Sequence, residues 1–348
     1  PGKDFRVVPV DPLTNFQPTG RNFVKNVNGE VITSLIQPFS RTPQERADLP
    51  VIPPPGIVYT DKLLPGGSGV VYFDVTYADM SAVPRLISHR LFVDLSERGV
   101  TGHTAFTAPV PVSCQKPVAL SPPLRGPGRF DANGCCAVIN AHRGSAAGLH
   151  LDGELRTAQQ FAIDWVQIGK DGRCCTGDPR RLQSWIGYGQ SIFAAASGTV
   201  FSIVRNMPDQ EPVGTLRNIK LATLAGNSII EDIGRGRFIL YAHMQPGSIP
   251  ALLRPGTHIE VGQMIGRLGN SGNSDAPHLH FHVMDSPSAL ISAGLPFVFN
   301  RLQVEGHIVG AEGRAVNALL TGKPLPITTN GSGTQLRKMP LSSTIFGF

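Results

Sequence analysis

The chain has 348 residues, enough for two domains, and a formal net charge of +6 at pH 7. This charge favours an anionic polymer as partner. The basic residues are scattered, however, and form no basic helix or nucleic-acid-binding motif, so we exclude nucleic acid. No apolar run approaches the roughly 20 residues that cross a bilayer, and we expect no transmembrane span.

Glycine and proline contribute 39 and 30 residues, a proportion that favours short strands joined by tight turns over long helices. We therefore predict a mainly β protein. The chain begins at Pro1 without a basic, apolar leader, so we expect that any signal peptide was removed or was not recorded.

The first third of the chain is predicted to hold an irregular segment, a small domain and a linker. Prolines interrupt any regular element in residues 1–54. Val70–Tyr77 and Leu91–Leu95 are rich in β-branched and aromatic residues and read as strands, which favours a small β-sandwich-like domain over residues 55–120. Closely spaced prolines and glycines then predict a linker over residues 121–128.

The rest of the chain is predicted to be one strand-rich domain over residues 129–300, followed by a C-terminal tail over residues 301–348 that packs on the surface. Glycine turns separate short apolar runs throughout the domain. The tail mixes glycine, threonine and serine with short apolar pieces.

Cysteine usage favours structural disulfides in an oxidising compartment over a metal or redox role. No two cysteines have the two-residue spacing of a zinc knuckle, and the odd number leaves at least one thiol unpaired. The connectivity stays open for the five residues Cys114, Cys135, Cys136, Cys174 and Cys175.

Three histidines alternate with apolar residues in the run His278–Val283. Because side chains alternate between the two faces of a strand, His278, His280 and His282 share one face. Three buried imidazoles suit a core poorly, since each needs hydrogen-bond partners. Neutral imidazole nitrogen is, by contrast, a preferred zinc ligand. The triplet therefore predicts a metal site, with a solvated histidine cluster as the alternative.

Several further blocks precede the triplet in a fixed order: Tyr188–Val200, Gly226-Asn227, Gly234–Gly236, Tyr241–Met244, Val261–Gly266 and Gly269–Ser274. In this order they resemble the lysostaphin/LytM-type zinc endopeptidases of bacterial cell walls, over about residues 160–285. The resemblance implies an antiparallel β-sheet domain, a zinc cofactor, and a periplasmic or extracellular location in a bacterial envelope.

The resemblance also implies the metal ligands. The family holds zinc with a His-x-x-x-Asp pair and with the second histidine of His-x-His, positions matched by Asp164 and His280. Gln160 stands where the family has its first histidine, and glutamine is a rare zinc ligand. For the third ligand we consider His282, which shares the strand face of His280 and is alternatively its hydrogen-bonded partner, and His142, which is alternatively an ordinary loop histidine.

The family's catalytic histidines match His243, in Tyr241–Met244, and His278. In the family-type mechanism, zinc polarises the scissile carbonyl and lowers the pKa of a bound water. One histidine accepts the proton of that water, and the other stabilises the oxyanion or protonates the leaving amine. The Asn270–Ser274 loop is then expected to form one wall of a substrate groove.

The missing family histidine looks like the feature of a subset. Certain envelope-located lysostaphin-type proteins share four segments with this chain: Leu124–Gly128, His142-Arg143, Gln159–Trp165 and His278–Asp285. The resemblance implies a zinc metallopeptidase that hydrolyses peptide bridges or cross-links of peptidoglycan. The alternative is a catalytically degenerate LytM-like binding or structural protein of the envelope. Expected partners are peptidoglycan or another anionic envelope polymer, and proteins bound through residues 1–54 and 301–348.

Overall fold

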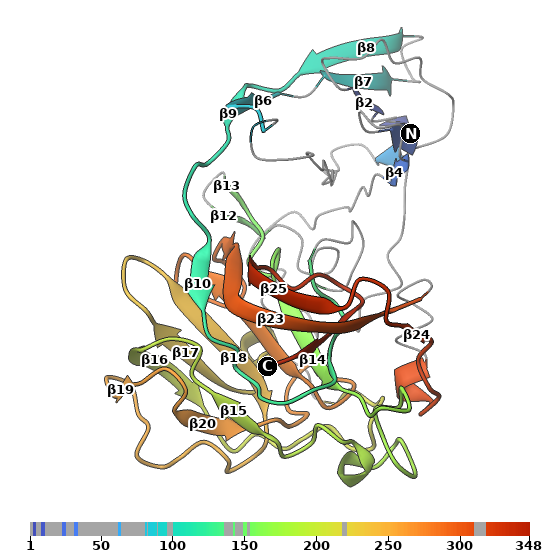
Figure 1. Cartoon of the computed structure of the whole chain (residues 1–348). Helices are drawn as coiled ribbons and strands as arrows, with labels where there is room; N and C mark the ends of the chain where they lie inside the picture. The colour runs from blue at the N-terminus through green and yellow to red at the C-terminus, as the bar shows by residue number, and fades with distance from the viewer. Residues whose placement is uncertain are drawn as a thin grey trace. The chain divides into compact units, whose positions relative to one another are not determined.

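The protein is described by a computed structural model (Figure 1). It divides into two compact units, residues 1–42 with 55–116, and residues 43–54 with 117–348. In the described part of the chain, no helix has both the length and the apolar character needed to cross a bilayer. The structure describes residues 3–4, 8–10, 23–25, 31–33, 62–63, 81, 83–88, 90–95, 100–135, 142, 149–151, 154–217, 221–309 and 318–348.

The first unit contains short antiparallel pairings. Its three-stranded sheet has the order β2 (Val8–Val10), β7 (Arg90–Leu95) and β8 (Val100–Phe106). The strand predicted at Leu91–Leu95 is thus confirmed within β7, whereas the one predicted at Val70–Tyr77 lies outside the described residues. The other pairs are β1 (Lys3–Asp4) with β5 (Lys62–Leu63), β3 (Phe23–Lys25) with β4 (Val31–Thr33), and β6 (Leu86–Ile87) with β9 (Val110–Pro111).

A thirteen-stranded sheet dominates the second unit and confirms the prediction of a mainly β protein. The sheet is mixed, because β10 runs parallel to β23 while its other pairings are antiparallel. Its order is β10 (Val118–Leu120), β23 (Phe297–Ile308), β26 (Thr344–Gly347), β11 (Arg129–Asp131), β14 (Ile163–Gln167), β21 (Leu279–Met284), β18 (Phe238–Met244), β17 (Asn227–Asp232), β16 (Gly198–Val204) and β19 (His258–Ile259).

Shorter elements complete this unit. Three strands branch from the main order: β22 (Gly294–Leu295) beside β21, and β24 (Ile327–Thr328) and β25 (Gly333–Lys338) beside β23. Separate pairs are β12 (Leu149–Leu151) with β13 (Glu154–Arg156), and β15 (Ser191–Phe193) with β20 (Met264–Arg267). Among the described residues of this unit, Leu182–Ser184 and Leu221–Thr223 form 3-10 helices, and residues 318–320 are α-helical.

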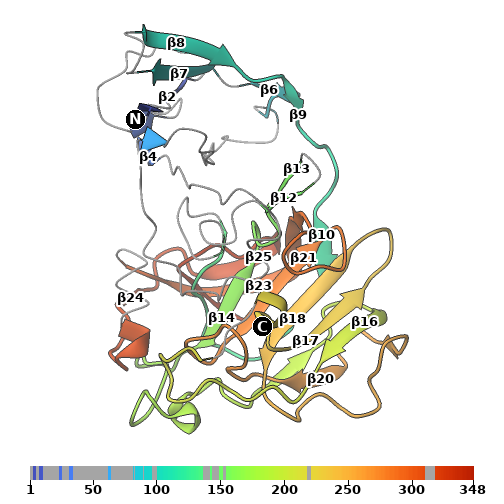
Figure 2. The same cartoon turned by 180° about the vertical axis from the view of Figure 1, so that it is seen from behind.

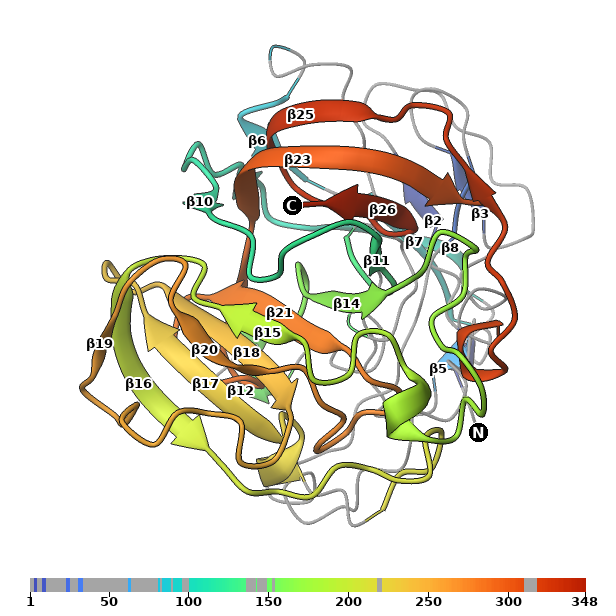
Figure 3. The same ribbon diagram turned by 60° about the horizontal axis from the view of Figure 1, so that its bottom comes forward.

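The segment 301–348, which the sequence predicts as a C-terminal tail, contributes β24, β25, β26 and most of β23 to the main sheet. Figure 3 shows β23, β25 and β26 at one end of the second unit and β16, β17 and β19 at the other. In β26, Ile345 and Phe346 are buried, and Phe346 meets the Trp165 ring of β14 edge-on at 5.9 Å. Residues far apart in sequence therefore support the strand β14.

The centre of the sheet is buried on both faces. β16, β17 and β18 also lie side by side when the unit is viewed from behind (Figure 2). On one face of β21, Leu279, Phe281 and Val283 join the main hydrophobic cluster, which also contains Ile192 of β15 and Ile265 of β20. Because side chains alternate along a strand, the even-numbered histidines of β21 face the other way.

Three of the five cysteines are free thiols in the described part of the chain. Cys114 is exposed, whereas Cys174 and Cys175 are buried, and all three are free. Burial, with the neighbouring Cys175 thiol adding to it, raises the pKa of Cys174 above its ordinary value. Disulfides in this chain therefore stay a prediction.

A carboxyl group is buried beside the main hydrophobic cluster. Glu231 of β17 is fully buried, and its Oε2 accepts a hydrogen bond of 2.7 Å from the hydroxyl of Tyr241. That hydroxyl in turn accepts one of 2.7 Å from the backbone N–H of Ala195. Burial raises the pKa of Glu231 to about 7, although the hydrogen bond from Tyr241 opposes the shift. The folded protein therefore favours the protonated carboxyl.

This shift predicts a pH-dependent loss of stability. The contribution of Glu231 to the free energy of unfolding does not change with pH below its unfolded pKa of 4.5. As the pH rises to 7 and above, ionisation of Glu231 lowers the free energy of unfolding by up to about 3 kcal/mol. Glu231→Gln should remove this loss, so urea unfolding at pH 4.5, 6 and 8 should show the variant gaining relative to wild type as the pH rises. A difference that stays constant across this range would contradict the shift.

Candidate metal centre

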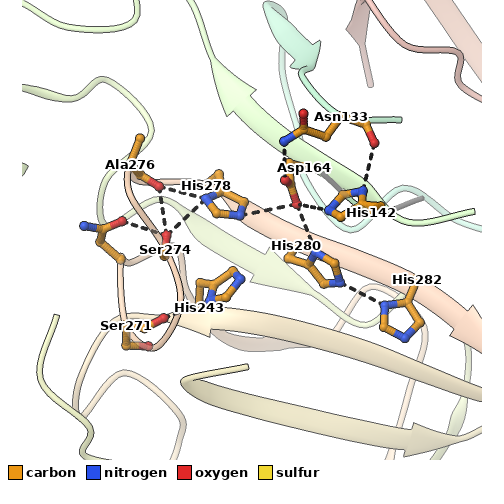
Figure 4. A network of polar contacts seen from close by, with 11 residues as sticks. Asn133, His142, Asp164, His243, Ser271, Ser274, Ala276, His278, His280 and His282 are labelled. Carbon is orange, nitrogen blue, oxygen red and sulfur yellow. Dashed lines mark hydrogen bonds and ion pairs between the residues drawn. The ribbon is translucent and has the colours of Figure 1, made fainter. Parts of the chain in front are cut away.

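Three imidazole nitrogens converge on one carboxylate oxygen in the second unit (Figure 4). Asp164 Oδ1, on β14, lies 2.9 Å from His280 Nδ1, 3.1 Å from His142 Nε2 and 3.3 Å from His278 Nε2. All four residues are buried. Such a concentration of nitrogen donors around a carboxylate in a dry site is typical of a metal centre.

The sheet register brings two of these side chains together. Asp164 stands directly opposite His280 in the antiparallel pairing of β14 with β21. His278, just before β21, shares the strand face of His280 and forms an isolated β-bridge with Gly269. The carboxylate and two of the imidazoles are therefore fixed by backbone hydrogen bonds of the main sheet.

His142 comes from outside these strands and is held by Asn133. Its Nδ1 donates to the backbone carbonyl of Asn133 at 2.8 Å. The side-chain amide of Asn133 donates to Asp164 Oδ2 at 2.7 Å. Asn133 thus positions both the carboxylate and the third imidazole, a role that no sequence pattern announced.

The structure places the two candidates for the third ligand differently. His142, Asp164 and His280 each offer a ligand atom, and these atoms lie within 4.8 Å of one another. His282 instead contacts the far side of the His280 ring, with 2.9 Å between its Nδ1 and His280 Nε2. Asp164 stands opposite His280, and its carboxylate turns towards His278 and His142, so His282 on the other side of His280 has no ion pair with it. Gln160 lies in the turn before β14.

The donor set fits a cation. A carbonyl oxygen only accepts hydrogen bonds, so His142 carries a proton on Nδ1 and directs Nε2 at Asp164 Oδ1. Two such atoms 3.1 Å apart are held together by a proton on Nε2 or by a metal ion between them. Ligand atoms on a tetrahedral zinc with bonds of about 2.0 Å are about 3.3 Å apart. The two contacts with Oδ1, at 2.9 and 3.1 Å, are close to this distance, and all ligand atoms of the group lie within 4.8 Å of one another.

Electrostatics give these groups the protonation states that a metal needs. Burial alone raises the pKa of Asp164, but the charges and hydrogen bonds of His142 and His278 outweigh it and hold the pKa well below the usual range. Burial lowers the pKa of His280 to about 4, and it lowers the pKa of His282 well below 6.5. Asp164 is therefore ionised, while His280 and His282 are neutral at pH 7.

The histidines next to this group differ in charge. Burial, followed by the neighbouring His278 and His280, lowers the pKa of His243 well below 6.5. Burial opposes protonation of His278 too, but the charge and hydrogen bond of Asp164 outweigh it and raise its pKa to about 9. The two rings lie 4.7 Å apart, centroid to centroid. One neutral and one cationic imidazole side by side can accept and donate protons in the same reaction.

His243 reaches this position through an unusual backbone. It lies near the end of β18 with φ = 61°, in the left-handed region that non-glycine residues seldom adopt. The pairing of β17 with β18 shifts register between Asn227 and Ile229, and such irregularities re-aim side chains. Its Nδ1 donates to the carbonyl of Ser271 at 2.8 Å, which leaves the lone pair on Nε2.

The Asn270–Ser274 loop orients both of these histidines. It supplies the Ser271 carbonyl to His243, and Ser274 Oγ lies 3.2 Å from His278 Nδ1. The same nitrogen lies 2.7 Å from the carbonyl of Ala276. The sequence predicted this loop as a groove wall, and that role stays a prediction. Its contacts with the rings, through the Ser271 carbonyl and the Ser274 hydroxyl, were not predicted from the residue types.

Two glycines allow the loop to approach β17. A Cβ added to Gly272 (φ = 76°) would lie 2.4 Å from the backbone nitrogen of Gly226. One added to Gly226 (φ = 59°) would lie 2.3 Å from the carbonyl oxygen of Ser271. Larger residues would therefore displace the carbonyl that fixes His243.

Residues 184–290, just under a third of the chain, match peptidase family M23. This M23 domain contains His243, His278 and His280, which are most of the imidazoles near Asp164. The predicted resemblance to lysostaphin/LytM-type peptidases is confirmed by this match, whereas the subset with Gln160 stays a prediction. No curated protein matches the chain.

Solved structures of low sequence identity are also similar. A mutant catalytic domain of the prophage-encoded M23 protein EnpA from Enterococcus faecalis is 17% identical, with 51% of this chain and 93% of that chain covered and a TM-score of 0.29. The catalytic domain of the antimicrobial peptidase lysostaphin from Staphylococcus simulans is 19% identical, with 49% of this chain and 84% of that chain covered and a TM-score of 0.24. A chain of the SpoIIIAH and SpoIIQ complex is 13% identical, with 50% of this chain and 96% of that chain covered and a TM-score of 0.29.

The geometry predicts which residue completes a metal site. His142→Ala should weaken zinc binding by at least about 100-fold, because it removes a ligand atom and even outer-shell changes cost 10- to 100-fold. Gln160→Ala, at the family's usual ligand position, is the matched control and should keep the wild-type affinity. Competition with a colorimetric chelator measures both. If only the Gln160 variant lost zinc affinity, Gln160 and not His142 would be the third metal ligand.

Proposed function

We propose that this protein is a zinc metallopeptidase that hydrolyses peptide bridges or cross-links of bacterial peptidoglycan. The observation that carries the proposal is the carboxylate of Asp164, with His280 Nδ1 and His142 Nε2 about it and two further histidines within reach. The M23 domain over residues 184–290 supports peptide-bond hydrolysis as the reaction.

In this proposal His142, Asp164 and His280 hold the zinc ion. Bound zinc polarises the scissile carbonyl and lowers the pKa of water. His243 is the general base, because its Nδ1 proton is fixed by the Ser271 carbonyl and its Nε2 lone pair remains to accept a proton. His278, in its cationic form, donates from Nε2 to the developing oxyanion or to the leaving amine.

The partner and location follow from charge and family. A net charge of +6 favours an anionic polymer, and peptidoglycan or another anionic envelope polymer is one such partner. The proposal therefore places the protein in the periplasm or outside the cell. We also propose that residues 1–54 and 301–348 contact other proteins of the envelope.

A non-catalytic envelope protein is the second candidate, and Gln160 is the observation that favours it. Loss of one ligand from a three-ligand set weakens metal binding, unless another residue replaces it. The position of His142 supplies such a replacement, which is why we favour the enzyme.

Elemental analysis of the full chain, purified without chelators or added metal, tests the proposal first. The enzyme requires about one zinc per chain. Mass spectrometry of purified peptidoglycan treated with this protein should then show newly released peptide termini. Absence of zinc, with no uptake when zinc is added, would favour the binding protein.

Two alanine variants should separate metal binding from proton transfer. His280→Ala should lose both zinc and hydrolysis, because it removes a ligand. His243→Ala should keep zinc at about one per chain and lose hydrolysis by about 10²- to 10⁴-fold, the usual contribution of a general base. His258→Ala, at an exposed position of β19, is the control and should retain both properties. Equal loss of zinc in the first two variants would contradict this division of roles.

A further inference from the structure

His282 is a buried polar residue that neither the metal group nor the proposed reaction uses. It lies fully buried on β21, directly opposite Leu240 of β18. Its Nδ1 lies 2.9 Å from His280 Nε2, and its Nε2 has no hydrogen-bond partner among the described residues. Burying an unsatisfied ring nitrogen is costly, so a purely structural role would be better served by an apolar side chain.

The partner of His280 differs in kind from those of the other site histidines. His142, His243 and His278 each direct Nδ1 at a backbone carbonyl, which only accepts hydrogen bonds. His280 instead directs Nε2 at another imidazole, whose Nδ1 either donates or accepts according to its tautomer. The hydrogen bond can therefore persist whichever nitrogen of His280 carries the proton.

This difference matters at Asp164. With no metal present, His280 Nδ1 donates its proton to the carboxylate, and Nε2 accepts a hydrogen bond from His282. As a ligand, His280 needs a bare Nδ1 and a protonated Nε2, so His282 must then accept. Both arrangements keep the ring in one place and leave each ring with one proton.

We propose that His282 is a positioning residue that holds the His280 ring with Nδ1 directed at the metal position, in both tautomers. The inference rests on the proposed zinc site and adds the residue that maintains its geometry. Contact with His280 occupies Nδ1 of His282, and the ring of His280, 5.1 Å away and nearly perpendicular, stands between it and Asp164. His282 therefore acts through His280 and does not bind the ion.

Two substitutions test this role in the full chain with zinc ions alone as the probe. His282→Leu is similar in size and has no polar hydrogen, so it should weaken zinc binding about 10- to 100-fold. The metal-free leucine variant should unfold near the wild-type temperature, since it removes the unsatisfied Nε2 of His282 but leaves Nε2 of His280 without its partner. His282→Asn restores a side chain that donates or accepts, and it should bind zinc within about threefold of wild type.

The outcomes are distinct. A leucine variant with wild-type zinc affinity, or an asparagine variant as weak as the leucine variant, overturns the positioning role and leaves the metallopeptidase proposal standing. A wild-type protein that takes up no zinc overturns both. If the leucine variant does not fold, His282→Met takes its place with the same expectations.

Discussion

The pairing of β14 with β21 is the constraint on which the site depends. Its register sets Asp164 opposite His280, and the pleat then directs both side chains to the same face. A slip of one residue would turn the carboxylate into the core and the apolar residues into the site. The apolar faces of both strands prevent that slip, because Ile163 and Phe281 are fully buried in the main cluster. Chemistry on one face is thus held in register by packing on the other.

The remaining histidines depend on irregular backbone. His243 itself has a left-handed backbone conformation, at a point where the pairing of β17 with β18 shifts register. Its ring is held by the carbonyl of Ser271, in a glycine-containing loop. A residue held in that conformation costs about 1–3 kcal/mol, which the surrounding contacts offset. His142 is fixed by Asn133, from a different part of the chain. Regular sheet therefore positions the carboxylate, whereas irregular segments position His142 and His243.

Part of this site could be predicted from sequence patterns. Alternation predicted that His278, His280 and His282 share a strand face, and the family resemblance predicted Asp164 beside them. The sequence favoured His282 over His142 as third ligand, because both His282 and His280 lie on one strand face, but periodicity gives a face and not a distance from a residue on another strand. Which of the two is the ligand stays a prediction. Asn133 and the Ser271 carbonyl were missed, since their contacts join separate segments. The place of β26 was equally hidden, because strand order is a tertiary property.

Strand order also has a consequence for how the protein assembles. Phe130 of β11 pairs with Ile345 of β26, so this contact joins residues about 215 positions apart. Asp164 and His280, 116 positions apart, likewise meet only through non-local pairing. Closing such loops is entropically costly, so we expect these contacts to form late in folding. Partly folded chains have the residues of the metal centre scattered, so tight metal capture would report that the central strands have already assembled.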